Sequence, residues 1–453
     1  MIADAPSDLI WIAVIGAEKK ENSHQMKKIL IVSYMFPPIS GGGTMRPLKY
    51  VKYLPDCEIQ PVVFCPRNAQ WKAYDHTNLD LPFLKKTTVY RCGIRRLQRY
   101  YHLRYTSGRR KHPLFYLLAV KYFCFLDFFS AWYFECRQNL FDIAKREKAA
   151  CVFTTSPPHS THMFGHYLKR TLQIPWIMDI RDAMAIDPNR RLSPLVRLQA
   201  SLEYRYEKKF YGSADAIISV SDPIVHSIRQ RHARLHLDAK THTITNGYDE
   251  DDFAVGGLRT KEKRQFVVTY TGSFMGRQSP EFFLKAVQSA IDRQSVQKDD
   301  IRIRFIGHYD EHIRFIMKRY QDRFPLEIVP FQPYAEALRY QLQSDLLLLI
   351  VNIEAHEGGA QTMTGKFFEY LGAARPILAL VPEGPLKETI IKGHFGVVTP
   401  PRDVPSIASA FIRLYREWKA TGGLTFQPDI KLRGTFTRRQ LTGKLADIIH
   451  SIT

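Results

Sequence analysis

Residues 358–380 bring together the side chains that an anion-binding site needs. Small and hydroxylated residues, including Thr364 and Gly365, fill 358–365, Lys366 and Glu369 follow, and 377–380 is wholly apolar. This order predicts a loop, a short helix, a tight turn and a buried strand. A loop of this kind leaves backbone N–H groups free at the positive end of the helix dipole, where a phosphate or diphosphate can bind. Glu369, one turn into the helix, could accept hydrogen bonds from ribose hydroxyl groups.

The same residues allow a simpler interpretation. Lys366 and Glu369 have the helical spacing of an ion pair on a solvated surface. Taken alone, the stretch therefore leaves an anion site and a surface ion pair equally open.

A family resemblance adds to these observations. Residues 365–371 (Gly-Lys-Phe-Phe-Glu-Tyr-Leu) and 375–377 (Arg-Pro-Ile) resemble the nucleotide-sugar site of retaining GT-B glycosyltransferases of family 4. Many members carry two glutamates with the spacing of Gln361 and Glu369, which are separated by seven residues. Glu369 matches the second glutamate, whereas Gln361 places an amide where the family has an acid near the transferred sugar. The resemblance covers about 28–452.

The composition of the chain limits its class. Its 453 residues exceed one ordinary core, so two domains are expected, and 45% hydrophobic with 24% charged residues indicates a folded globular protein. A net charge of +21 predicts an anionic partner, which could be a nucleic acid, an anionic membrane surface or a phosphorylated substrate. No RNA-binding signature accompanies the charge, so nucleic acid is disfavoured.

The cysteines and the N-terminal residues indicate the cellular compartment of the protein. The six cysteines lie in the first third of the chain without a Cys-x-x-Cys pair, which favours a reduced, cytosolic protein without structural zinc. The apolar run 9–17 is too short to span a bilayer, and acidic residues precede it. We therefore expect 1–25 to be an extension of little structural consequence.

The first half opens with a second candidate phosphate loop. The apolar run 29–33 predicts a central parallel strand, and Gly41, Gly42 and Gly43 follow it before Thr44, which could cap a helix. Glycines let a ligand touch the backbone, and the resemblance places this loop under the donor diphosphate and the acceptor. A flexible turn without a ligand is the alternative.

Further short strands are expected at 61–64, 89–92, 151–154, 176–179, 216–220 and 243–245, separated by helices. Between them, 95–111 is rich in arginine and tyrosine, and 114–134 is crowded with aromatic residues. This combination suits the interface of an anionic membrane, and a buried helix with a solvated basic loop explains it equally well.

Two polar loops follow strands in this half. His159 and His162 come after the strand at 151–154, and the resemblance favours His159 as a residue of the ligand cleft. Asp179, Arg181 and Asp182 end the next strand and resemble the acceptor side of the family's cleft. An internal ion pair that braces the loop is the competing explanation for these charges.

The second half restarts with a strand at 266–270, which leads to Ser273 and Arg277. The guanidinium of Arg277 could bridge both phosphates of a sugar nucleotide, although a surface arginine is the alternative. Strands at 302–306, 326–329, 346–350, 377–380 and 397–399 and helices at 280–292 and 335–343 complete a second doubly wound sheet. The last helix begins after Thr437.

The predicted fold is therefore α/β of the GT-B type, with two Rossmann-like doubly wound domains and a cleft between them. The expected layout is an extension (1–25), an acceptor domain (26–246), a linker (247–264), a nucleotide-sugar-binding domain (265–430) and a closing helix (431–453). The resemblance implies an enzyme that moves a sugar from a UDP- or GDP-sugar to a glycan or lipid-linked acceptor with retention of configuration, in cell-surface polysaccharide or glycolipid assembly.

No Asp-x-Asp motif lies near the expected diphosphate, so we expect neither a metal nor another cofactor. The expected location is the cytoplasm, peripheral to the inner face of the cell membrane. A catalytically weakened relative that binds sugar nucleotides or glycans is the second hypothesis, because Gln361 and Ser273 depart from the family pattern.

Overall fold

The computed structural model describes residues 12–13, 26–67, 73–93, 127, 129–182, 194–254, 265–274, 278–351 and 363–453. The chain divides into two compact units, Met1–Ile244 with Thr442–Thr453, and Thr245–Leu441. The expected linker, 247–264, begins inside the second unit, and its residues 255–264 lie outside the described ranges.

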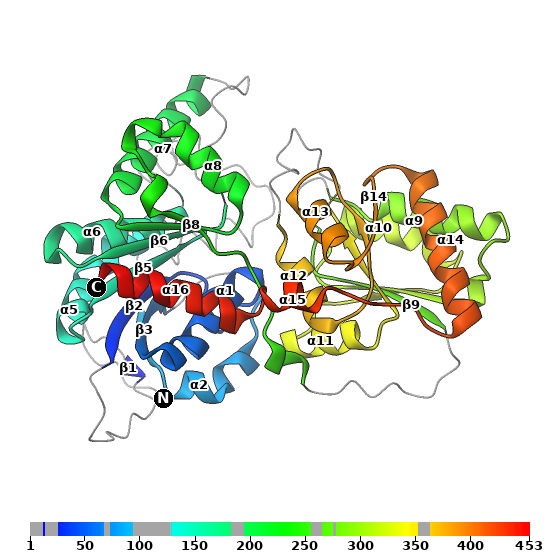
Figure 1. The fold of residues 1–453 in the computed structure, drawn as a ribbon, viewed down its shortest axis with the longest axis horizontal. Helices are drawn as coiled ribbons and strands as arrows, with labels where there is room; N and C mark the ends of the chain where they lie inside the picture. Colours follow the sequence, from blue (N-terminus) through cyan, green and yellow to red (C-terminus); the bar gives the residue numbers. More distant parts are fainter. Residues whose placement is uncertain are drawn as a thin grey trace, which may run out of the picture. The chain divides into compact units, whose positions relative to one another are not determined.

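Among the described residues, the first unit contains an eight-stranded sheet in the order β1-β4-β3-β2-β5-β6-β7-β8 (Figure 1). Neighbouring strands from β4 to β8 run parallel, as predicted. The strands are β1 (Ile12–Ala13), β2 (Lys27–Ser33), β3 (Ile59–Pro66), β4 (Thr88–Cys92), β5 (Cys151–Ser156), β6 (Trp176–Ile180), β7 (Ala216–Ser219) and β8 (Thr241–Thr243). The helices are α1 (Gly42–Tyr53), α2 (Pro82–Lys85), α5 (Ser130–Arg146), α6 (His162–Leu172), α7 (Pro194–Ser213) and α8 (Asp222–Arg231), joined by the last turns of α16 (Arg438–Ile452).

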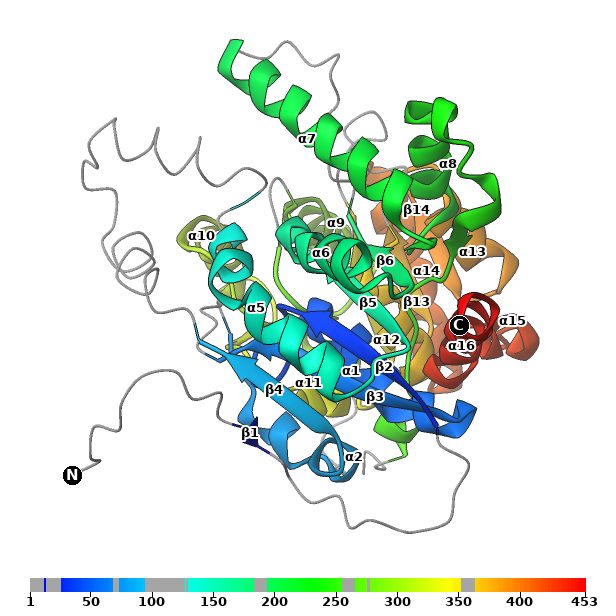
Figure 2. The same ribbon diagram turned by 90° about the vertical axis from the view of Figure 1, so that its left-hand side faces the viewer.

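Helices cover both faces of this sheet because its strands are apolar on both sides. Leu30 and Val32 pack with α5, α6 and α7 in one cluster, and Figure 2 shows α5 and α6 side by side over that face. On the opposite face, Tyr50 of α1 contacts Phe153 of β5 with ring centroids 5.6 Å apart. This doubly wound arrangement positions the loops at the carboxyl ends of the strands.

Within the described part of the second unit, six parallel strands follow the order β11-β10-β9-β12-β13-β14. They are β9 (Phe266–Thr271), β10 (Ile301–Ile306), β11 (Leu326–Val329), β12 (Leu346–Ile350), β13 (Ile377–Leu380) and β14 (Gly396–Thr399). The helices are α9 (Glu281–Asp292), α10 (Glu311–Gln321), α11 (Tyr334–Leu342), α12 (Gly365–Ala373), α13 (Pro385–Lys392), α14 (Val404–Thr421), α15 (Ile430–Gly434) and the first turn of α16. One apolar cluster joins α9, α10 and α14 to the sheet, and another joins α12 and α13 to its other face.

Three expectations need correction. The 1–25 segment contributes β1, in which Ile12 pairs with Tyr90 and Ala13 with Val89. Thr44 does not cap α1, because the helix begins at Gly42 and the Thr44 hydroxyl donates to the carbonyl oxygen of Ile39 over 3.0 Å.

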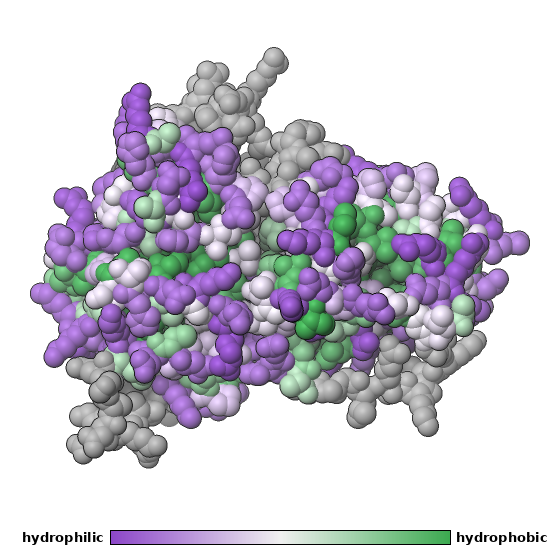
Figure 3. All heavy atoms as spheres, viewed as in Figure 1, coloured by the Kyte–Doolittle hydropathy of each residue, from purple (hydrophilic) through white to green (hydrophobic). Residues whose placement is uncertain are grey.

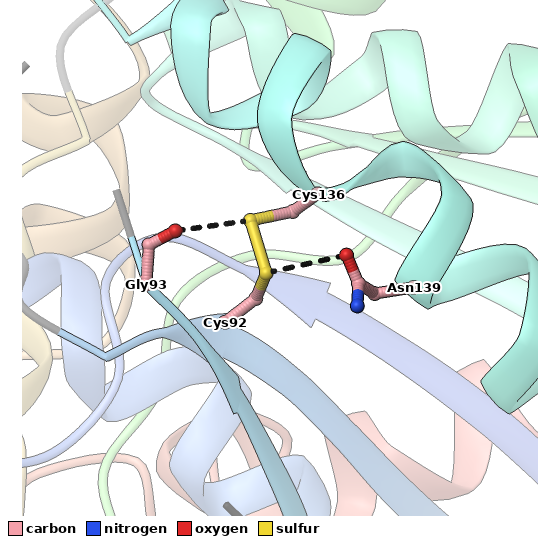
Figure 4. Close-up of a disulfide and its surroundings, with 4 residues drawn as sticks. All are labelled: Cys92, Gly93, Cys136 and Asn139. Atoms are coloured by element: carbon pink, nitrogen blue, oxygen red, sulfur yellow. Dashed lines mark hydrogen bonds between the residues drawn. A yellow bond between two sulfur atoms is a disulfide. The ribbon is translucent and has the colours of Figure 1, made fainter. Parts of the chain in front are cut away.

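The third correction concerns the cysteines, which we expected to be reduced. Cys92 at the end of β4 and Cys136 of α5 form a disulfide, with the Gly93 carbonyl oxygen and the Asn139 side chain beside the sulfur atoms (Figure 4). The spacing of the cysteines along the chain carries no signal for this pair, because the fold alone brings α5 back to the edge of β4.

The last helix, α16, begins after Thr437 as expected, and the Thr437 hydroxyl caps it by accepting from the backbone N–H of Gln440 over 3.4 Å. The basic and aromatic segment at 95–111, and most of 114–134, lie outside the described residues. No helix within the described ranges is both long and apolar enough to cross a bilayer. Hydrophilic residues cover most of the face drawn in Figure 3.

Candidate functional site

In the second unit, the loop after β9 approaches the loop after β10 so closely that glycine is required. Gly272 has φ +111° and donates its N–H to the carbonyl oxygen of Ile306 over 2.8 Å. A Cβ atom added to Gly307 would lie 2.3 Å from the Gly272 carbonyl oxygen. The two loops therefore form a tight backbone junction at the carboxyl edge of the parallel sheet, where α/β proteins place ligands.

Lys366, the second residue of α12, lies against this junction. A Cβ atom added to Gly272 would lie 2.3 Å from the Cε atom of Lys366. Its ammonium group donates to the Ser273 carbonyl oxygen over 3.4 Å and lies 5.2 Å from the centre of the Tyr270 ring. Tyr270 supports the same loop, since its hydroxyl donates to the Ser273 carbonyl oxygen over 3.2 Å. The cation is thus held by a carbonyl group and an aromatic face, and no carboxylate pairs with it among the described residues.

Burial changes the proton affinity of both charged residues of α12. It lowers the pKa of the Lys366 ammonium to about 8, although the Glu369 carboxylate acts in the opposite direction. It raises the pKa of the Glu369 carboxyl group to about 6, against the effects of Lys366 and of a hydrogen bond with Gln341. Both side chains are half-buried, so the expected alternative of a solvated surface pair does not describe them.

The N-terminus of α12 provides the predicted N–H groups. Thr364 is the N-cap residue with extended backbone, and its side chain makes no capping hydrogen bond. Its carbonyl oxygen accepts from the N–H of Phe367 over 3.2 Å. Gly365 has open space where a Cβ atom would lie. An anion placed here would meet backbone donors and the Lys366 ammonium together.

Two residues that we did not predict, Gln341 and Tyr370, form hydrogen bonds with the strands that carry this site. Gln341 of α11 is fully buried, donates to the Thr271 hydroxyl over 2.9 Å, and leaves its Oε1 atom without a hydrogen-bond partner in the described part of the chain. The Tyr370 hydroxyl accepts from the Thr271 N–H and donates to the Leu348 carbonyl oxygen, each over 3.1 Å. The sequence could have indicated Gln341, because it is a polar residue on the apolar face of a helix. Arg277 and Gln361, both predicted for this site, lie outside the described residues.

In the first unit, Gly41, Gly42 and Gly43 lie where β2 leads into α1. Gly41 has φ +130° immediately before the helix, which explains a glycine there. At Gly43, a Cβ atom would lie 2.2 Å from the Met35 sulfur, and the carbonyl oxygen accepts from Arg181 over 2.6 Å. The Gly43 backbone is therefore packed against Arg181 and is not a free surface for a ligand.

Asp179 and Arg181 have internal partners. The carboxylate of Asp179 forms a fully buried ion pair with Arg46, with a shortest N–O distance of 2.8 Å, and accepts from Thr155 over 2.7 Å. Arg181 also donates to the carbonyl oxygens of Ser156 and Pro157. The ion-pair explanation for this loop is therefore the one that the structure supports, and only Asp182 is exposed.

The two histidines of the loop after β5 differ in their surroundings. His162 is fully buried with its Nδ1 atom 2.9 Å from the Thr154 hydroxyl, and burial holds its pKa well below the usual value. His159 is half-buried at the start of a short 3₁₀ turn (His159–Thr161), and its buried Nδ1 atom has no hydrogen-bond partner among the described residues. Burial lowers the pKa of His159, while Asp127 and Asp182 raise it. Of the two, His159 is the one that could contact a ligand.

Across the described ranges, no group of three or more His, Cys, Asp or Glu side chains is arranged to hold a metal ion.

Comparison with known proteins agrees with this architecture. Residues 265–417 match the family described as Glycosyl transferases group 1. No curated protein sequence matches the chain at a significant level. A glycosyltransferase from Rickettsia africae ESF-5 is similar in structure, with a TM-score of 0.61 and 14% identity over 95% of this chain and 99% of the other.

Two further solved structures share the fold. An α,α-trehalose-phosphate synthase (UDP-forming) from Burkholderia xenovorans, in complex with glucose-6-phosphate, has a TM-score of 0.63 and 10% identity over 94% of this chain and 100% of its own. A lipopolysaccharide outer core galactosyltransferase, WaaB in its apo form, has a TM-score of 0.54 and 12% identity over 94% of this chain and 99% of its own.

Proposed function

We propose that this chain transfers a sugar from a UDP- or GDP-sugar to an acceptor hydroxyl with retention of configuration, because its fold is of the GT-B type and residues 265–417 match the group 1 glycosyl transferases. The observation that carries this proposal is the Lys366 ammonium, which lies at the carboxyl edge of the second sheet without a carboxylate partner in the described residues. The trehalose-phosphate synthase that shares the fold is UDP-forming, which supports a nucleoside diphosphate as the leaving group.

In this mechanism, the leaving diphosphate gains negative charge as the glycosidic bond breaks. The N–H groups of Gly365 and Lys366, and the Lys366 ammonium, would stabilise that charge because they are already in position. Arg277 would assist, Ser273 and Thr364 would line the phosphates, and Glu369 would bind the ribose. Gln361 would lie near the transferred sugar. In the first unit, His159, Gly41 and Gly42 would contact the acceptor, whereas the Gly43 backbone is covered by Arg181.

We propose that the reaction needs no metal ion, since cations and helix N–H groups can neutralise the diphosphate. Turnover should then persist in EDTA. Activity that disappears with EDTA and returns with added Mg²⁺ or Mn²⁺ would contradict this.

The proposed acceptor is a cell-surface polysaccharide precursor or a glycolipid at the cytoplasmic face of the membrane. The net charge of +21 supports attraction to an anionic surface. The structural relative WaaB is a lipopolysaccharide outer core galactosyltransferase, which supports an acceptor of this class.

The direct test is sugar transfer or donor hydrolysis with a panel of UDP- and GDP-sugars. The Lys366→Met variant should lower kcat by about 10²- to 10³-fold, as loss of one preorganised donor does. Lys285→Met removes an exposed lysine of α9 that pairs with Glu281, and it should leave kcat unchanged. Equal rates in both variants would contradict the role of Lys366.

A second candidate function is sugar-nucleotide binding without efficient transfer, because Gln361 is an amide where the resembled family has an acid. Tight binding of a UDP- or GDP-sugar with no turnover across the panel would favour it. In that case, Gln361→Glu should increase turnover.

A further inference from the structure

A cavity of about 250 Å³ opens in the first unit, at the carboxyl ends of three neighbouring strands. Phe36 follows β2, Pro66 and Arg67 lie at the end of β3, and Arg91 is the last residue but one of β4. These strands lie next to one another in the sheet, so their ends meet at one edge. This is the edge at which α/β folds bind ligands.

Backbone hydrogen bonds fix one side of the cavity. Ser40 donates its N–H to the Ala73 carbonyl oxygen over 3.0 Å, and Asp75 donates its backbone N–H to the Pro38 carbonyl oxygen over 2.8 Å. An antiparallel bridge between Ile39 and Tyr74 lies between these bonds. The Tyr74 and His76 side chains, which line the cavity, therefore belong to a segment tied to the loop after β2.

The cavity is cationic. Arg67, Arg91 and His76 line it, and no acidic side chain is among its described lining residues. Arg91 donates to the Pro37 carbonyl oxygen over 2.6 Å, which orients its guanidinium while other N–H groups of the fork remain. Neither arginine forms an ion pair in the described part of the chain. Two guanidinium groups that pair with no carboxylate can bind the oxygen atoms of an oxyanion. The aromatic and proline side chains beside them can contact a ring or an apolar group that carries the oxyanion.

We propose that this cavity binds a phosphate group of the acceptor substrate. The inference rests on the proposed function, in which the second unit holds the nucleotide. The volume is slightly below that of typical small-molecule pockets, so it suits one phosphorylated sugar or head group and not an extended glycan. Arg67 and Arg91 bind the phosphate oxygens, and Tyr74 contacts the group that carries the phosphate.

Calorimetric titration of the full-length protein tests this, with UDP at saturation so that the nucleotide site is occupied. Glucose 6-phosphate should bind at least tenfold more tightly than glucose, and inorganic phosphate should compete with it. Equal affinity for glucose and glucose 6-phosphate would overturn the proposal. Failure of UDP itself to bind would instead count against the proposed function, so the two failures are distinguishable.

Variants locate the binding. Arg67→Ala removes an exposed side chain and should fold normally, and Arg91→Gln keeps an amide that can donate to Pro37. Each should weaken glucose 6-phosphate binding at least tenfold and leave UDP binding unchanged. Arg170→Ala removes an exposed charge near the end of α6 as the matched control. If all three variants weaken binding equally, the effect is general electrostatics and the cavity is not the site.

The phosphate could be carried by a sugar or by a lipid. Flotation with phosphatidylcholine vesicles, with or without phosphatidic acid, separates these sources. Retention on phosphatidic acid that is lost in Arg67→Ala but kept in Arg170→Ala supports a lipid head group. Tight glucose 6-phosphate binding without such retention supports a sugar phosphate. Binding in both arms that is insensitive to Arg67 and Arg91 overturns the proposal.

Discussion

At the scale of single residues, burial shifts the pKa values of the two charged residues of α12, Lys366 and Glu369. Their pKa values of about 8 and about 6 leave Lys366 a cation and Glu369 largely an anion at neutral pH. The charged form of each group is less stable here than in water. An anionic ligand that contacts Lys366 would therefore replace part of the solvation free energy that the ammonium group loses on burial.

This predicts how nucleotide affinity depends on pH. In the free protein, Lys366 loses its proton above pH 8, so the Kd of UDP should rise between pH 8 and 9.5, by at most tenfold per pH unit. Titration calorimetry across this range measures it. Lys366→Met should bind UDP weakly at pH 7.5 and lack the increase, whereas Lys285→Met should retain it. A flat profile in the wild type would contradict the assignment.

The same pKa has a consequence for stability. The pKa of Lys366 is lowered on folding from 10.5 to about 8, so between these values the unfolded chain binds more protons than the folded one. The contribution of Lys366 to the free energy of unfolding therefore rises with pH through this window, relative to Lys366→Met.

Asp179 gives a prediction for the first unit. Asp179→Ala would leave the fully buried guanidinium of Arg46 without its carboxylate, so we expect a loss of about 3–5 kcal/mol in the free energy of unfolding. Denaturant unfolding measures this. Asp182→Ala changes the exposed carboxylate of the same loop and should shift stability by less than about 0.5 kcal/mol. Equal effects of the two substitutions would mean that the buried ion pair contributes little.

At the scale of elements, the junction between β9 and α12 depends on a glycine. Gly272→Ala would place a Cβ atom 2.3 Å from the Lys366 side chain at φ +111°, so we expect a loss of about 1–3 kcal/mol and a displaced ammonium group. Thermal unfolding and UDP titration should both report the change. Gly423→Ala, which has open space and no left-handed backbone, should alter neither.

The disulfide joins two other elements, β4 and α5, through residues that are 44 positions apart in the sequence. Closing this loop restricts the unfolded chain, so reduction should lower the free energy of unfolding by about 2–4 kcal/mol. Unfolding with and without dithiothreitol measures the effect. A Cys92→Ser/Cys136→Ser double variant should be less stable and should no longer respond to the reductant, and a response that survives would implicate other cysteines.

At the scale of the whole molecule, the two sheets are separate cores with different ligands in our proposal. UDP or GDP at a hundred times its Kd should add about 2.7 kcal/mol to the free energy of unfolding of the unit that binds it. Thermal-shift screening should show this for the wild type and much less for Lys366→Met. No shift with any nucleoside diphosphate would contradict the nucleotide site.

The fold could be predicted because its signals are local. Runs such as 29–33 and 346–350 are apolar at nearly every position, which marks strands covered on both faces, and the predicted strands at 326–329, 346–350 and 377–380 agree with β11, β12 and β13. The start of α16 after Thr437 also follows from a residue type that is favoured at helix ends, and α12 begins at Gly365, one residue before the predicted helical run.

The sequence by itself thus determined two doubly wound sheets and the residue types on which the proposed diphosphate site rests, because periodicity and glycine-rich loops act over a few residues. Only the tertiary structure decided which charged groups have internal partners. It paired Asp179 with Arg46, joined Cys92 to Cys136 and left Lys366 beside Gly272. It also gathered Arg67 and Arg91 into one cavity. These contacts depend on which strand ends meet at one edge of a sheet, and neighbours in the sequence carry no information about that.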